Sequence, residues 1–423
     1  MSIYRSSIPM RGFEHAAARR DVAEAILVRV EFAGGGEGWG ETLPRPYVTG
    51  ETMESVADDL ERLVFPAMVA GEALPQRTTG GRCINAALCA AELAYMSAGN
   101  ADCGLRIADC GLPRPGSRRA SRPVSVGARQ CGQMTPEPGP IRVTGVLGSA
   151  NPARTLKRLM LMRLFGLRDF KLKLGFGDDI DRENLRLVHR RIARAVAAGR
   201  CSLRVDVNGG WDAASTPSRV AELVQYGVCV VEQPVFCPMA ELVDLAGRCK
   251  LPLMADESLL TIEDGKVGTP PHFRNCSDSR GLDDSCVIPT SASLPATSGN
   301  EEASPLSPRI WWNIRISKNG GIGPCRRLAA MAAGAGIPFT VGAMVGESGI
   351  LSAAQRFLLS GIPGPRFVEG NYGRFLLADD ITRPSPRFGY GGRLRPLGGR
   401  GLGVRVDPRK LAKYARLLKV VEP

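Results

Sequence analysis

FKLKLG, at residues 170–175, is an apolar stretch that carries two lysines one residue apart. Side chains alternate across a β-strand, so Lys171 and Lys173 should point to the same side of a sheet. An isolated Lys-x-Lys pair is usually part of a solvent-exposed face. The sequence that follows argues against this interpretation, because further short apolar runs come next and each of them ends in acidic residues.

These runs are LRVDVN at 203–208, VCVVEQP at 228–234 and LPLMADE at 251–257. Their acidic residues Asp206, Glu232 and Asp256 follow Lys173 in steps of 33, 26 and 24 residues. Each step has the length of about one strand-plus-helix unit. The alternation predicts a parallel sheet and, since it is repeated along the chain, a closed βα barrel.

Length and composition set outer bounds. A chain of 423 residues with 44% hydrophobic residues can bury large cores and favours two or three domains. The net charge of +13 raises nucleic acid as a partner, but the basic residues are scattered, without a zinc-finger, RNP-like or basic-heptad pattern. The positive net charge therefore indicates attraction to anionic small molecules rather than binding of nucleic acid.

Cysteine usage and the N-terminus favour a soluble cytoplasmic protein. The 12 cysteines are dispersed without a C-x-x-C motif, and only 3 histidines are present, so a Cys/His zinc site is not favoured and reduced thiols are expected. Neither a signal-like N-terminus nor an apolar run of 18 residues occurs.

The first 140 residues predict an α+β domain. An alternating run at 26–32, a glycine turn at 34–36 and GWGE at 38–41 are typical of a β-hairpin. Helices are expected at 51–69 and 84–96, and the region from 99 is an irregular linker. Helices are also expected at 151–165, 180–198, 215–226, 239–248, 324–334 and 349–360, with strands near 311–318, 338–343 and 366–369.

Residues 265–309 break this rhythm. Ser, Pro, Thr, Gly and Asp dominate this low-complexity insert, and no helix is predicted in it. With few apolar residues to bury, it should be mobile, lie outside the barrel and contribute no catalytic group. The functional alternative is a lid over the barrel mouth.

The strand ends carry the chemistry. In a βα barrel the C-terminal strand ends converge, so Asp206, Glu232 and Asp256 should meet at one mouth. Three such carboxylates repel one another unless a cation lies among them, and all-oxygen ligation suits Mg²⁺. The alternative is three unrelated helix-capping or loop acids.

Two lysines would flank such a metal. Lys173 lies on one strand and Lys318 follows another, WWNIRIS at 311–317. A lysine close to a divalent cation and to a second ammonium has its protonated form disfavoured, so it can act as a base near neutral pH. The metal would stabilise developing negative charge while the lysines move protons.

Five motifs together resemble the enolase superfamily, in its mandelate racemase/muconate lactonizing enzyme subgroup. They are Lys171-x-Lys173, Asp206-x-Asn208, EQP at 232–234, DES at 256–258 and ISKNGG at 316–321. The resemblance implies an α/β fold: a modified (β/α)7β TIM-type barrel over 141–385, with an α+β capping domain from 1–140 to which the tail, 386–423, returns.

The resemblance also implies roles for individual residues. Asp206, Glu232 and Asp256 would bind Mg²⁺, with Mn²⁺ as the alternative, and Asn208 and Glu257 would lie behind these ligands. Lys173 and Lys318 would be the catalytic acid/base pair on opposite faces of the substrate. Lys171 and Glu347 would bind substrate, although Glu347 is equally well explained as an exposed loop acid. Specificity would come from cap loops at 15–20 and 45–49 and from the eighth strand end.

The expected function is a racemase or epimerase of an amino-acid-like or dipeptide-like acid, working through an enediolate. A cycloisomerase or β-elimination lyase, of the muconate cycloisomerase or o-succinylbenzoate synthase type, is the alternative, and a non-catalytic ligand-binding relative is a second one. Dipeptide epimerases of this subgroup show Asp-x-Asp at the eighth strand, which VEGNYG at 368–373 lacks. The expected partner is a small-molecule carboxylate, with no nucleic acid or membrane, and the resemblance favours a homo-oligomer.

Overall fold

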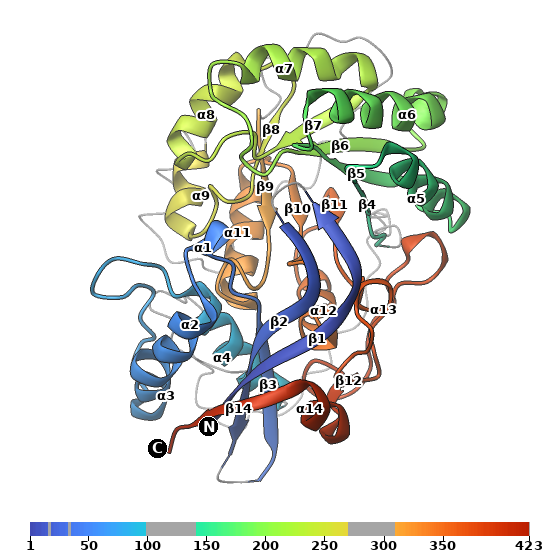
Figure 1. Ribbon diagram of the computed structural model, residues 1–423. Coiled ribbons are helices and arrows are strands. Elements are labelled where there is room, and N and C mark those ends of the chain that lie inside the picture. Colours follow the sequence, from blue (N-terminus) through green and yellow to red (C-terminus); the bar gives the residue numbers. More distant parts are fainter. Residues whose placement is uncertain (16–17, 33–34, 99–140, 270–308, 423) are drawn as a thin grey trace, which may run out of the picture.

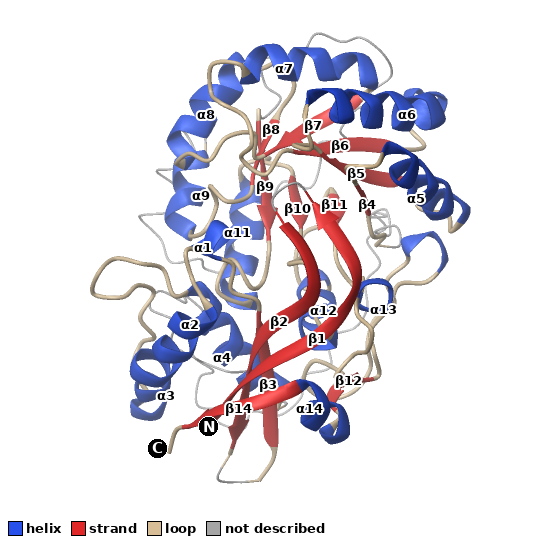
Figure 2. Cartoon of the chain, in the orientation of Figure 1, coloured by secondary structure: helices blue, strands red, loops and turns tan. Residues whose placement is uncertain are grey.

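The computed structural model describes residues 1–15, 18–32, 35–98, 141–269 and 309–422. An eight-stranded parallel sheet curls through one half of the molecule, and a four-stranded antiparallel sheet lies beside it (Figures 1 and 2). The expected α/β fold, a TIM-type barrel with an α+β cap, is confirmed.

The barrel consists of seven strand–helix units and a final strand. Its strands are β4 (Gly145–Leu147), β5 (Asp169–Lys173), β6 (Ser202–Asp206), β7 (Val228–Glu232), β8 (Leu253–Ala255), β9 (Ile310–Ile314), β10 (Phe339–Val341) and β11 (Phe367–Val368). The helices after the first seven strands are α5 (Pro152–Leu164), α6 (Asp178–Ala197), α7 (Thr216–Leu223), α8 (Met239–Arg248), α9 (Ile262–Gly268), α11 (Ile322–Gly334) and α12 (Gly349–Leu359).

A short seam joins the two edges of this sheet. Val143, just before β4, forms a parallel bridge with Val368 of β11, and the amide N–H of Thr144 donates to the carbonyl of Val368 over 2.8 Å. Because β11 has only two residues, the neighbouring β4 residue Val146 pairs with β5 but not with β11. The backbone pairing that closes the barrel is therefore short.

The cap combines both ends of the chain. Its sheet has the order β14-β1-β2-β3, with β1 (Ser2–His15), β2 (Ala18–Glu31), β3 (Glu37–Thr42) and β14 (Ala415–Val420). Its helices are α1 (Pro46–Thr49), α2 (Met53–Asp59), a π-helical turn (Leu60–Val64), α3 (Phe65–Ala70) and α4 (Asn85–Ser97). Between barrel and β14 lie α13 (Gly373–Leu376), β12 (Thr382–Arg383), a 3₁₀ turn (Tyr390–Gly392), β13 (Arg405–Val406) and α14 (Pro408–Tyr414).

The GWGE stretch is explained by close packing of α4 on β3. A Cβ atom on Gly38 would lie 1.8 Å from the carbonyl oxygen of Ala94, and one on Gly40 equally close to that of Ala90. Only glycine permits this approach of helix backbone to strand. The predicted hairpin is confirmed, since β2 and β3 pair antiparallel, whereas the long strand β1 was not predicted.

One expectation about the insert is wrong. Residues 262–268 form α9, so the insert begins with the end of a helix and a helix does follow the fifth barrel strand. A capping box of Thr261 and Asp264 starts this helix, because each side chain accepts a hydrogen bond from the other residue's backbone. The rest of the insert, 270–308, lies outside the described residues, as does 99–140.

Two further features concern the described residues. The seven cysteines among them form no disulfide bonds with one another. None of the helices in the described ranges is long and apolar enough to cross a membrane.

Buried glutamates of the cap bind the N-termini of barrel helices. Glu41 on β3 accepts from the backbone N–H groups of Ser348 (2.9 Å) and Leu351 (3.1 Å) at the start of α12. Glu92 on α4 accepts from those of Ile322 and Gly323 at the start of α11. Helix N-termini present unpaired N–H groups and favour negative charge. These contacts therefore hold the cap against the barrel.

Replacing Glu92 with glutamine should make stability less dependent on pH. Burial raises the pKa of Glu92 to about 7, so the folded protein keeps a proton that the unfolded chain releases near its ordinary pKa of about 4.3. This group should make the free energy of unfolding fall as the pH rises from about 4.5 to 7, and Glu92→Gln should remove that part of the slope.

Denaturant unfolding at several values between about pH 5 and 8 measures the two slopes. Glu72→Gln, at an exposed position, is the matched control and should keep the wild-type slope. Identical slopes for wild type and Glu92→Gln would contradict the prediction.

Candidate active site

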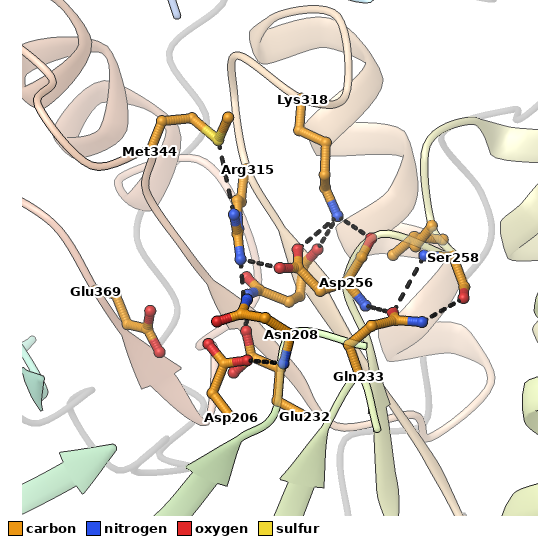
Figure 3. Close-up of polar contacts among 12 residues, drawn as sticks. Asp206, Asn208, Glu232, Gln233, Asp256, Ser258, Arg315, Lys318, Met344 and Glu369 are labelled. Carbon is orange, nitrogen blue, oxygen red and sulfur yellow. Dashed lines mark hydrogen bonds and ion pairs between the residues drawn. The ribbon is translucent and has the colours of Figure 1, made fainter. Parts of the chain in front are cut away.

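Adjacent barrel strands bring three carboxylates to one mouth. Asp206 at the end of β6 is in register with Lys173 of β5 on one side and with Glu232 of β7 on the other. Asp256 directly follows β8. All three carboxylates are fully buried and lie together in Figure 3. The structure therefore gathers the residues that the sequence predicted as metal ligands.

Two lysines of β5 pair with the first two carboxylates. The Lys173 ammonium donates to Asp206 over 3.0 Å and to the Asn208 side chain over 2.7 Å. The Lys171 ammonium lies 3.3 Å from Asp206 and 3.2 Å from Glu232. Burial disfavours the charge of Asp206, but the two lysines outweigh it and hold the pKa of Asp206 below its ordinary value.

Asp256 is paired with cations that follow the neighbouring strand β9. The Arg315 guanidinium donates to Asp256 and lies 3.5 Å from Glu232, so it bridges the two carboxylates (Figure 3). The Lys318 ammonium donates to the carbonyl oxygens of Asp256 (2.6 Å) and Asn313 (2.7 Å) and to the Asp256 carboxylate (3.1 Å). Burial, and then the Arg315 charge, lower the pKa of Lys318 to about 7.

The carboxylate oxygens of this cluster are the kind of ligand that a divalent cation prefers, although the side chains are not arranged as a preformed metal site. Within the described residues, no three His, Cys, Asp or Glu side chains are grouped closely enough to hold a metal ion, because lysines and Arg315 lie among the carboxylates. Glu257, however, is half-buried, and both of its carboxylate oxygens are buried without a hydrogen-bond partner. Burial, and then the Asp206 charge, raise its pKa to about 7. An unpaired buried carboxylate beside three others is what a bound cation would satisfy.

A cavity of about 720 Å³ opens over this cluster. Among the predicted site residues, it is lined by Lys171, Lys173, Asn208, Glu257 and Glu347. Lys318, with no exposed surface, is not part of the lining. The structure thus presents one of the two expected acid/base lysines to the cavity and turns the other toward backbone carbonyls.

Glu347 is buried, so its interpretation as an exposed loop acid is wrong. It follows β10, and its carboxylate accepts from the Met344 N–H over 2.6 Å. Burial raises its pKa to about 8. At the cap, Arg45 and Tyr47 from the predicted specificity segment 45–49 also line the cavity. The other predicted segment, 15–20, lies partly outside the described residues.

The sequence interpretation missed two charged residues of the site, Arg315 and Glu369. Glu369, directly after β11, is paired with Lys171 (2.7 Å) and with Arg204 of β6 (2.8 Å). Both could have been found in the same way as Asp206, by looking for charged residues at the ends of the barrel strands. Arg315 directly follows β9 and points to the same side as Asn313, two residues earlier, and Glu369 is the first residue after β11.

Comparison with known proteins adds the family. Residues 154–266 and 311–410 match the family described as "Enolase C-terminal domain-like". The chain is 26% identical over 377 residues to the L-Ala-D/L-Glu epimerase of Bacillus subtilis, covering 84% of this chain and 83% of that protein. It is 27% identical over 399 residues to muconate cycloisomerase 1 of Pseudomonas putida, covering 92% and 90% of the two chains.

Solved structures support the fold alone, because their sequence identities are low. The N-succinyl Arg/Lys racemase of Bacillus cereus matches with a TM-score of 0.68 at 22% identity, covering 99% of this chain and 100% of that one. The muconate lactonizing enzyme of Pseudomonas fluorescens, in complex with muconolactone, matches with a TM-score of 0.69 at 24% identity and 98% coverage of both chains.

On the family match and the similar isomerases together, the chain belongs to the enolase C-terminal domain-like family, in the mandelate racemase/muconate lactonizing enzyme subgroup, and is an enzyme of the isomerase type.

Proposed function

We propose that the protein removes the proton α to a carboxylate and returns a proton to the same carbon, so that it racemises or epimerises an amino-acid-like or dipeptide-like acid. One observation carries this proposal. Lys173 on β5 and Lys318 after β9 flank the three strands whose ends bear Asp206, Glu232 and Asp256. An acid held above those carboxylates would have one lysine on each side.

The two lysines are suited to proton transfer in different ways. With its pKa lowered to about 7, Lys318 is partly neutral at neutral pH and can accept a proton. Lys173 lines the cavity and is oriented by Asp206 and Asn208. Lys318 would have to turn from the Asp256 and Asn313 carbonyls to reach a ligand.

Asp206, Glu232 and Asp256 would hold Mg²⁺, or Mn²⁺ as the alternative, with Asn208 and Glu257 beside them. Such an ion would supply electrostatic stabilisation for the enediolate charge that develops on the substrate. Lys171 and Arg315 line the same end of the cavity and would attract and orient the substrate carboxylate. Glu347 would contact the substrate from the loop after β10.

The eighth strand end favours an acid without a free ammonium group. Glu369 is the acidic residue there, and its two oxygens are engaged by Lys171 and Arg204. An N-acylated or otherwise uncharged nitrogen avoids the need for a further carboxylate. The relative that racemises N-succinylated arginine and lysine supports this substrate class.

The cytoplasmic location and the homo-oligomeric state stay predictions.

Cycloisomerisation or β-elimination is the second candidate, and a specific observation favours it. Only Lys173 of the two lysines lines the cavity, and these reactions need one lysine to act chemically. The similar muconate cycloisomerases support the same alternative.

Exchange of the α-proton in deuterated water should distinguish the two lysines. With N-acyl amino acids and Mg²⁺, we expect wild type to exchange both enantiomers. Lys173→Ala should slow exchange of one enantiomer by about 10²-fold or more, and Lys318→Ala that of the other, because each lysine reaches one face. Proton NMR of the two enantiomers measures the rates.

Lys250→Ala, at an exposed position, is the control and should exchange both enantiomers at wild-type rates. Full exchange and turnover by Lys173→Ala would refute the proposal. Turnover that needs Lys173 but survives Lys318→Ala would instead support cycloisomerisation or elimination.

Removing one carboxylate should weaken metal binding. Asp206→Asn leaves the shape of the side chain but removes a negative charge between Lys173 and Glu232, so Mg²⁺ affinity should drop by at least about tenfold in calorimetric titrations without substrate. Asp244→Asn, at an exposed position of α8, should titrate like wild type. Equal Mg²⁺ affinity of Asp206→Asn and wild type would exclude Asp206 as a ligand.

A further inference from the structure

The cavity above the carboxylates has a second, apolar end. Besides the charged groups at the barrel mouth, its lining includes side chains from α5 and from the segment after β11: Leu161, Met162, Phe165, Phe375, Phe388 and Tyr390. The two ends belong to one continuous cavity of about 720 Å³. This volume is in the upper range of pockets that enclose drug-sized ligands, about 300–1,000 Å³.

Helix α5 forms one wall of the apolar end. Arg158, Leu161, Met162 and Phe165 line the cavity and follow one another at the three- and four-residue spacing of a single helix face. The Arg158 guanidinium donates to the carbonyl of Gly148 near the mouth, over 3.4 Å. Phe165 comes seven residues later, which places it about 10 Å further along the helix axis. The part of this helix that lines the cavity is therefore about 10 Å long.

Aromatic rings join this wall to the opposite one. Phe165 contacts Phe388 edge to face, with ring centroids 6.0 Å apart, and Phe375 stacks on Phe388 at 5.2 Å. Tyr372 contacts Phe388 at 5.3 Å, and its hydroxyl donates to the Thr144 carbonyl at the barrel seam. The apolar end thus lies beside the seam between β4 and β11.

Several of these apolar side chains are unusually exposed for their type. Leu161 is 57% exposed, Phe375 44% and Phe165 37%. Single exposed apolar residues are ordinary, but a group that lines a cavity continuous with a catalytic mouth indicates a ligand surface.

We propose that this apolar end binds the substituent of the substrate, so that the preferred substrate is an acid with an extended apolar, preferably aromatic, group. The group would extend from the barrel mouth toward the ring of Phe165. The carboxylate lies at the opposite end, where Lys171, Lys173 and Arg315 face the cavity. This inference rests on the proposed function, since it assigns the substrate class of that same site.

A pair of N-acylated alanines tests it. N-acetylalanine and N-(4-phenylbutanoyl)alanine share the reacting carbon and differ in the apolar reach of the acyl group. With Mg²⁺ present, the phenylbutanoyl compound should bind at least about tenfold more tightly in calorimetric titrations, and its kcat/KM for α-proton exchange should be higher by a similar factor. Leu161→Ala and Phe375→Ala should each lower these ratios severalfold.

Leu417→Ala is the matched control for Leu161→Ala, because Leu417 is 47% exposed on the cap strand β14 and is not part of the cavity lining. It should leave both ratios unchanged. Equal affinities for the two acids, no binding of the phenylbutanoyl compound, or wild-type ratios in Leu161→Ala and Phe375→Ala would overturn the inference.

The two readouts separate this inference from the proposed function. A calorimetric preference for the phenylbutanoyl acid that is lost in Leu161→Ala supports the apolar end even when neither acid exchanges its proton, a result that would count against the proposed chemistry. Exchange of both acids without a difference in affinity would support the proposed chemistry and refute the role of the apolar end.

Discussion

The structure depends on the mutual neutralisation of buried charges at the barrel mouth. Asp206, Glu232 and Asp256 have no exposed surface, and moving a lone carboxylate into such a place costs several kcal/mol. Lys171 and Arg315 offset this cost by contacting two or three carboxylates each. The network orients Lys171, Lys173 and Arg315, which face the cavity, and removing one partner leaves the others uncompensated. Glu257, which lacks a hydrogen-bond partner, is the one described carboxylate of this cluster that the protein's own donors leave unpaired.

The cap is tied to this mouth by a second use of buried carboxylates. Glu41 and Glu92 bind the N-termini of α12 and α11, the two helices that follow β10 and β9. Near Lys318, the side chain of Asn85 donates to the Lys318 carbonyl over 2.8 Å, and the Ser317 hydroxyl pairs with that of Thr42. Since α11 begins four residues after Lys318, the same contacts set the position of the cap and the position of Lys318, the lysine proposed to transfer a proton.

The seam of the barrel explains why the cavity has two chemical characters. Strands β5 to β9 end in charged residues or are directly followed by them, and Lys171, Lys173 and Arg315 line the polar end of the cavity. Among the described residues, the backbone contact between the β4 and β11 edges is the Val143–Val368 bridge with its neighbouring amide. Side chains of α5 and of the segment after β11 line the cavity beside this seam. These side chains are aromatic and aliphatic. An acid that spans both ends would place its charged group and its apolar group in matching surroundings without moving the backbone.

The sequence alone determined the order of the elements and the residues at the strand ends. The alternation of apolar runs with amphipathic helices is local, so the helices around residues 151–165, 180–198, 239–248 and 349–360 were predicted close to their observed bounds. Lys173, Asp206, Glu232 and Asp256 were identified because parallel strands in a barrel bring equivalent ends together. The tertiary structure alone decided what these groups contact. Four such features depend on distances between residues far apart in the chain. Arg315 bridges two carboxylates, Lys318 turns to backbone carbonyls, Glu347 is buried, and Phe165 contacts Phe388. Sequence periodicity carries no information on such distances, because it describes which face a side chain takes but not what lies opposite that face.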